Sequence, residues 1–150
     1  MFGVLLIVGG FLAVSSWSWS RMGRGEEVDA KELAPYLALL LKEDLGYPGF
    51  KKEWLRKAWV NGFQDHTYLF LVKADSDEMR TAVEKIAGTE PVQHTFYKEG
   101  GYLGPSTAPG WWDTASVDSA PGARYFQNDK GRLWRFTWIG DSLYLVVCAS

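Results

Sequence analysis

The chain is poor in the residues that crosslink a fold or hold a metal. Its 150 residues include one cysteine and two histidines. A single cysteine excludes a disulfide within the chain, and no HExxH or CxxC spacing marks a zinc site. Cys148 follows an apolar strand pattern, which favours a small buried side chain over a reactive thiol. No residue pattern indicates a cofactor, and we expect none.

Charge is missing from one long stretch at the start of the chain. Residues 2–20 carry no charged side chain. The strictly apolar part, residues 2–14, would span only about 20 Å as a helix, short of a hydrocarbon core of roughly 30 Å. The serines and tryptophans that follow bring it close to the length a span needs, and tryptophan suits the membrane interface. We therefore predict an uncleaved single-pass membrane anchor over residues 1–24.

Two alternatives to the anchor remain open. Ala13-Val14-Ser15 is a small-x-small triplet of the kind cleaved from signal peptides, although no basic residue precedes the apolar core. The stretch also fits a buried N-terminal core element. By the positive-inside rule, Arg21 and Arg24 favour a domain on the cytoplasmic side of the membrane. This conflicts with the extracytoplasmic position that a family resemblance, described below, implies.

The rest of the chain is mildly acidic. The 16 basic and 18 acidic residues give a net charge of −2, and Arg21 and Arg24 are two of the basic ones. Residues 25–150 therefore show no basic footprint for nucleic acid, and we expect no nucleic-acid partner. Their length fits one domain with one core.

Periodicity predicts an α+β fold. Asp29 and Glu32 form a possible capping box before a helix with leucines on one face, which ends at Gly46. A second box over residues 75–78 begins another helix, with Met79, Val83 and Ile86 expected to point inward. Strand patterns occupy residues 53–61, 66–74, 92–97, 123–128, 132–139 and 142–148.

These elements run in the order α-β-β-α-β-loop-β-β-β. Runs of adjacent strands with two helices predict an antiparallel sheet of about five to six strands, with both helices packed on one face. Strand 66–74 is apolar on both faces and is expected to be central. On strand 132–139 we expect Trp134, Phe136 and Trp138 to share one face. Gly25, Glu26 and Glu27 are interpreted as a short linker.

The loop over residues 99–122 has no helical or strand period. Loops of that length are uncommon inside a domain and are often functional. This one contains Tyr102, Trp111 and Trp112, with Asp113 directly after the pair. One interpretation is a lid folded over an open sheet face. The other is a binding site for a protein or small molecule, rimmed by these four residues.

The motif order resembles that of small uncharacterised bacterial proteins. The sequence has Gly62-Phe63-Gln64-Asp65 before an apolar strand, then a capped helix, then Trp111-Trp112, and then a strand beginning Arg124-Tyr125-Phe126. Members of that group have an N-terminal hydrophobic segment and one α+β domain. The resemblance implies an extracytoplasmic position but no activity, and it assigns no functional residue.

The histidines offer a weaker hypothesis. His66 and His94 each precede a threonine and an aromatic residue. If their strands were neighbours, they and Asp65 could form an acid/base or metal cluster.

The sequence thus favours a membrane-tethered, non-catalytic binding or structural module of the bacterial envelope that uses loop 99–122. One alternative is a small hydrolase-like or metal-dependent enzyme using Asp65, His66 and His94. Another is an immunity-like or inhibitor-like protein that neutralises a partner.

Overall fold

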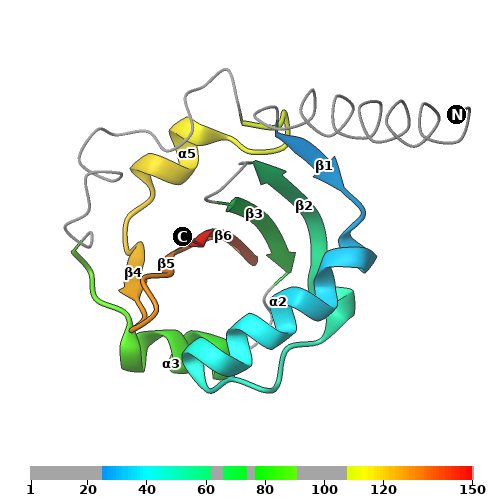
Figure 1. The fold of residues 1–150 in the computed structure, drawn as a ribbon. Helices are drawn as coiled ribbons and strands as arrows, with labels where there is room; N and C mark the ends of the chain where they lie inside the picture. The colour runs from blue at the N-terminus through cyan, green and yellow to red at the C-terminus, as the bar shows by residue number, and fades with distance from the viewer. Residues whose placement is uncertain (1–24, 62–65, 74–76, 91–107, 150) are drawn as a thin grey trace, which may run out of the picture.

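A six-stranded antiparallel sheet forms the centre of the protein (Figure 1). A computed structural model describes residues 25–61, 66–73, 77–90 and 108–149. The strand order is β1-β2-β3-β6-β5-β4. The strands are β1 (Glu26–Val28), β2 (Leu55–Asn61), β3 (His66–Lys73), β4 (Arg124–Gln127), β5 (Leu133–Ile139) and β6 (Ser142–Ala149). The α+β class and the antiparallel sheet are confirmed.

Strand β3 lies in the middle of the sheet, as its two apolar faces predicted. It pairs with β2 on one side and, from His66 opposite Ala149 to Lys73 opposite Ser142, with β6 on the other. Leu69 and Phe70 point to opposite faces and are both fully buried. Other parts of the chain therefore cover both faces of the sheet, since an uncovered face would leave one of these two side chains exposed to water.

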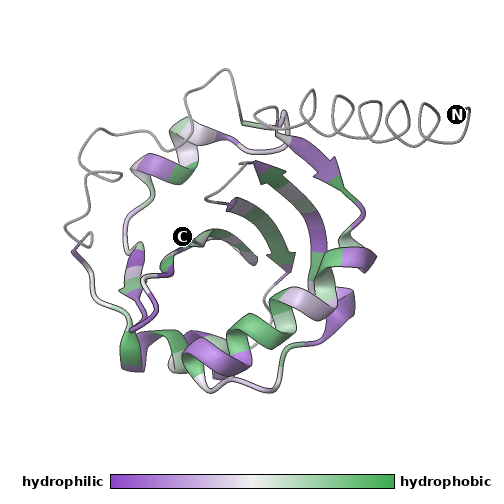
Figure 2. Cartoon of the chain, viewed as in Figure 1, coloured by the Kyte–Doolittle hydropathy of each residue, from purple (hydrophilic) through white to green (hydrophobic). Residues whose placement is uncertain are grey.

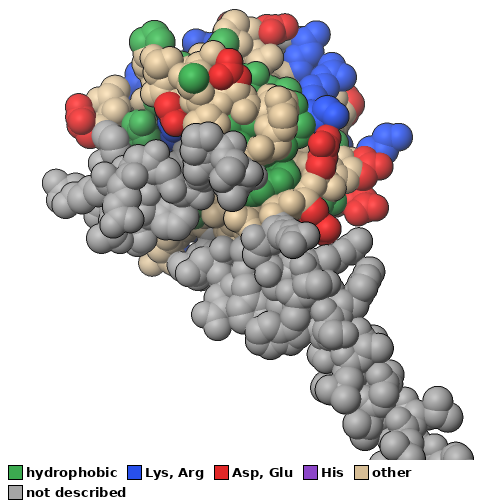
Figure 3. Space-filling view, turned by 90° about the horizontal axis from the view of Figure 1, so that it is seen from above, with side chains coloured by type: hydrophobic (Ala, Val, Ile, Leu, Met, Phe, Trp, Pro, Cys, Tyr) green, Lys and Arg blue, Asp and Glu red, His purple; other side chains and the backbone are tan. Residues whose placement is uncertain are grey.

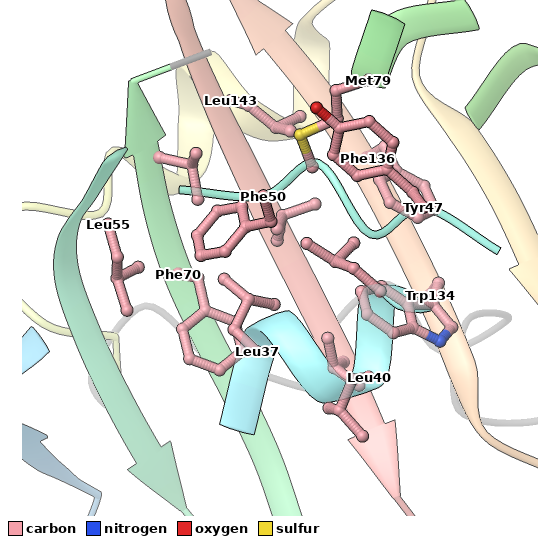
Figure 4. Close-up of a cluster of buried hydrophobic side chains, with 14 of the residues drawn as sticks. Leu37, Leu40, Tyr47, Phe50, Leu55, Phe70, Met79, Trp134, Phe136 and Leu143 are labelled. Atoms are coloured by element: carbon pink, nitrogen blue, oxygen red, sulfur yellow. The ribbon is translucent and has the colours of Figure 1, made fainter. Parts of the chain in front are cut away.

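Helices α2 (Ala30–Leu45) and α3 (Asp77–Ile86) pack on one face of the sheet. Polar and apolar residues are interleaved along both helices (Figure 2). The buried side chains of both helices are all apolar and belong to the core on this face. The main core lies between α2 and the sheet, where Leu37 and Leu40 meet Phe70 and Trp134 (Figure 4). Trp134, Phe136 and Trp138 share this face, as predicted.

The predicted caps explain where α2 begins and ends. The Asp29 carboxylate accepts a hydrogen bond from the Lys31 amide at 2.9 Å, so the helix begins before Pro35 and keeps that proline inside it. Gly46 ends the helix with φ +64°. The amide of Tyr47, the residue after it, donates to the Leu41 carbonyl at 3.1 Å, a bond typical of a glycine-terminated helix.

A buried polar cluster joins the end of α2 to β5. Both oxygens of the Asp44 carboxylate accept a hydrogen bond from Arg132 Nη1, at 2.9 Å for Oδ1 and 2.8 Å for Oδ2. Oδ2 accepts another from Trp134 Nε1 at 2.6 Å. Asn128 Nδ2 donates a further bond at 3.0 Å. Four bonds to one buried carboxylate make this a structural ion pair.

Four sequence interpretations differ from the structure. Glu26 and Glu27 belong to strand β1 rather than a linker, because they pair with Val60 and Trp59. Residues 52–54 form a short 3-10 helix, η1 (Lys52–Trp54), before β2 begins. Ile86, the last residue of α3, has 38% of its surface exposed, whereas Met79 and Val83 are buried as expected.

The fourth difference concerns loop 99–122, which contains a short helix, α5 (Thr114–Ser119), on the face opposite α2. A third helical element thus covers the sheet, in addition to the two predicted on one face. The predicted strand 92–97 and the predicted N-terminal hydrophobic helix lie outside the described residues.

Candidate functional site

Residues 108–119 cross the second face of the sheet and carry the predicted tryptophan pair. Trp112 is 5% exposed and packs its ring edge-on against Tyr144 of β6, with the ring centres 5.3 Å apart. Trp111 is half-buried and lies 5.9 Å from Trp112. Val117 of α5 completes the contact with the sheet. We call this surface the α5 face.

Local hydrogen bonds place the pair. The Trp112 amide donates to the Pro109 carbonyl at 2.9 Å, which closes a turn just before α5. Asp113 then caps α5, since its carboxylate accepts from the Ser116 amide at 3.2 Å and from the Ser116 hydroxyl. The hydroxyl bond, followed by the amide bond, lowers the pKa of Asp113. Asp113 thus has a structural use as a helix cap.

A buried arginine ties α5 to the sheet. Arg135 of β5 is 5% exposed, although it stands in an otherwise apolar strand. Its Nη1 donates to Asp118 Oδ1 at 2.6 Å and its Nη2 donates to the Val117 carbonyl at 2.8 Å. Its guanidinium also lies 5.9 Å from the ring centre of Tyr125, its partner on β4.

Trp111 and Thr137 on this face each have a buried polar atom that has no hydrogen-bond partner among the described residues. These atoms are the indole nitrogen of Trp111 and the hydroxyl of Thr137, whose side chain is fully buried. Thr137 is next but one to Arg135 on β5 and lies opposite Tyr144 in the register. Because buried polar groups are nearly always satisfied by protein, water or ligand, these atoms are available to bind something.

Seen from above, this side of the molecule presents apolar side chains between acidic and basic ones (Figure 3). The α5 face therefore combines aromatic rings, a buried cation and unsatisfied polar atoms within one layer. Such a mixture is typical of small-molecule and peptide sites.

The described part of the chain gives little support to an acid/base or metal cluster built on the histidines. His66 begins β3, is half-buried, and stacks on Tyr68 with ring centres 6.0 Å apart. Asp65, His94 and Tyr102 lie outside the described residues. Within the described ranges, no three His, Cys, Asp or Glu side chains are grouped closely enough to hold a metal ion.

Cys148 has the environment that its sequence position indicated. It is half-buried, and its Sγ lies 3.8 Å from the Thr67 hydroxyl. Burial raises its pKa to about 11, against a smaller lowering by the contact with Thr67.

The sequence interpretation missed the polar half of this site. The polar half consists of Arg135, Thr137 and Tyr144 on the sheet and of Asp118 on α5. One signal was present, because a charged residue sat between apolar ones on a strand expected to be buried. Its partner could not be read from the sequence, since α5 was not predicted.

The comparisons place no relative beside this chain. No family model, no curated protein and no solved structure matches it. The part of the chain that the structure describes contains no helix long and apolar enough to cross a membrane.

Proposed function

We propose that this chain is a membrane-tethered, non-catalytic binding module of the bacterial envelope, and that its binding surface is the α5 face. The observation that carries the proposal is the environment of Trp111. It is a half-buried aromatic ring whose N–H is buried and has no hydrogen-bond partner among the described residues. Tryptophan is enriched at binding hot spots because one ring supplies both apolar area and a directed donor.

The two acidic groups of α5 support binding over catalysis. Asp113 is engaged in capping α5 and Asp118 in pairing with Arg135. A general base needs a carboxylate or imidazole free to take a proton near a substrate. Neither of these carboxylates meets that need while α5 is in place.

The tether is proposed on the uncharged residues 2–20. The described chain begins at Gly25, directly before edge strand β1. Trp59, which belongs to the apolar cluster of the α5 face, lies against Gly25, the first described residue.

Site-specific photo-crosslinking in the native host tests the binding surface. A photoreactive side chain replaces Trp111 in one strain and Asp141, an exposed turn residue, in a control strain. We expect an adduct of defined mass from position 111 and none from position 141. No adduct, or the same adducts at both positions, would contradict the proposed surface.

Fractionation tests the tether separately. The full-length protein is expected to sediment with membranes and to resist a carbonate wash. Replacing Leu5, Leu6 and Ile7 by aspartate is expected to release it, because charges are costly in a hydrocarbon core. Release of the unmodified protein by the wash would rule out an integral anchor.

A further inference from the structure

The two members of the ion pair between Arg135 and Asp118 differ in their exposure to solvent. The Arg135 side chain is 7% exposed, whereas the Asp118 side chain is 47% exposed. Moving the Arg135 side chain into water would require α5 to leave the sheet. The Asp118 side chain can reach water by rotating about its own bonds. A buried guanidinium without an anion is costly, so the position beside it will hold some acceptor at all times.

The ion pair between Asp44 and Arg132 is an example of a pair in which neither member can be replaced. Asp44 is 3% exposed, and Arg132, Asn128 and Trp134 all donate to it. Neither member of that pair can leave without breaking several bonds. Asp118 has one bond to Arg135 and stands at the surface, so it is replaceable in a way that Asp44 is not.

The helix that carries Asp118 is also easy to displace. Helix α5 has six residues, fewer than a helix needs to be stable alone. Its hold on the sheet consists of Val117, the arginine bonds and the adjacent tryptophan turn. A two-residue turn with Gly122 at φ +80° follows it. A small shift of α5 would therefore expose Arg135 at limited cost.

We propose that Arg135 anchors a carboxylate of the ligand, and that Asp118 occupies this position until the ligand displaces it. This inference rests on the proposed function and names the ligand chemistry of the same face. The Thr137 hydroxyl lies two residues along the strand as a further polar contact. The rings of Trp112 and Tyr144 supply an apolar wall for the body of the ligand. The ligand class is thus an aromatic or apolar group bearing a carboxylate, as in a small acid or a peptide C-terminus.

Ligand-observed NMR with the full chain in phosphatidylcholine nanodiscs tests the proposal. The probes are N-acetyl-L-phenylalanine and its uncharged amide. The unmodified protein is expected to bind the acid at least about tenfold more tightly than the amide, because the amide loses the charge-assisted bond. An eight-residue peptide ending in phenylalanine distinguishes a peptide source, which would bind more tightly than the small acid, from a small-molecule source.

The sharpest variant is Asp118→Asn. It removes the internal competitor and leaves Arg135 in place, so we expect about tenfold tighter binding of the acid and little change for the amide. Asp129→Asn is the matched control, because it makes the same change of side chain at an exposed carboxylate in the loop just before β5. Its affinity should equal that of the unmodified protein.

Arg135→Gln should abolish the preference for the acid, with the melting curve reporting whether the fold survives. If it does not fold, Asp118→Asn decides alone. An unchanged affinity in Asp118→Asn, or an equal gain in Asp129→Asn, overturns the proposal. Equal binding of acid and amide that Trp111→Ala weakens would overturn the carboxylate anchor but leave the binding surface of the proposed function intact.

Discussion

The indole of Trp59 packs against Gly25, so closely that a Cβ atom at Gly25 would be 1.5 Å from Trp59 Cζ2. Trp59 is 3% exposed and belongs to the apolar cluster of the α5 face. The contact fixes Gly25, the residue before β1, against this cluster. Only glycine leaves room for the indole at this position.

Replacing Gly25 by alanine should therefore destabilise the domain. The added methyl group must push Trp59 out of its place or lift β1 from β2, at a cost of about 1–3 kcal/mol. Gly110→Ala is the control, because no heavy atom lies within 4 Å of a Cβ there. Chemical denaturation of both variants measures the difference, and equal stabilities would mean that Trp59 can move at no cost.

Phe70 is the most informative single test of the core. It is fully buried in the central strand, between α2 and the sheet (Figure 4). Phe70→Ala is expected to cost about 3–5 kcal/mol, a large part of the stability of a small domain. Leu39→Ala removes an apolar side chain that is 49% exposed and should cost less than about 1 kcal/mol. A loss below 1 kcal/mol for Phe70→Ala would contradict the sheet order.

The centre of the fold was predictable because its signals are local and redundant. The hairpin of β2 and β3, the meander of β4 to β6 and the end of α2 at Gly46 each follow from an apolar period bounded by turn residues. Burial of β3 on both faces followed from the same pattern. The edge strand β1 was missed because its glutamates face solvent, and only pairing with β2 makes it a strand.

The candidate site was predictable only in part, for a different reason. Trp111 and Trp112 stood out by residue type within an irregular stretch. Arg135 and Asp118 are 17 residues apart, and their contact depends on α5 folding back over β5. Helix α5 has no apolar period long enough to be recognised, since six residues give less than two turns.

The buried carboxylate of Asp44 should be indispensable. Asp44→Ala leaves the Arg132 guanidinium and the Trp134 N–H without their acceptor, so we expect a loss of about 3–5 kcal/mol. Asp129→Ala, an exposed carboxylate in the loop just before β5, serves as the control and should change stability by less than about 0.5 kcal/mol. Thermal unfolding of the two variants gives the comparison. A tolerated Asp44→Ala would mean that water replaces the carboxylate.

The two adjacent tryptophans should differ in their effect on stability. Trp112 is buried against Tyr144, so Trp112→Ala is expected to cost about 3–5 kcal/mol. Trp111 is only half-buried, and Trp111→Ala should cost about 1 kcal/mol. Melting curves of both variants test this asymmetry. Equal collapse of the fold would make the segment a structural lid and weaken the case for a binding surface.

Cys148 provides a prediction about pH. Burial raises the pKa of its thiol to about 11, from about 9 in an unfolded chain. At pH 8 the thiolate fraction in the folded protein is therefore on the order of 100-fold smaller than for a free cysteine, and reaction with a disulfide reagent should be slower by a similar factor. Full reactivity should return in denaturant, which serves as the internal control.

The same shift affects stability in alkaline solution. The unfolded thiol loses its proton above about pH 9, while the folded thiol keeps it until about pH 11. The folded state is therefore favoured fully below pH 9, and this contribution is lost as the pH rises towards 11. Tyr68, whose pKa burial raises from 10 to about 12, adds a similar loss at higher pH, so the interval from pH 9 to 10 isolates Cys148. Cys148→Ala should flatten the fall in stability over that interval, as measured by urea unfolding at half-unit steps of pH. An unchanged slope in the variant would mean that the thiol is open to water in the folded protein.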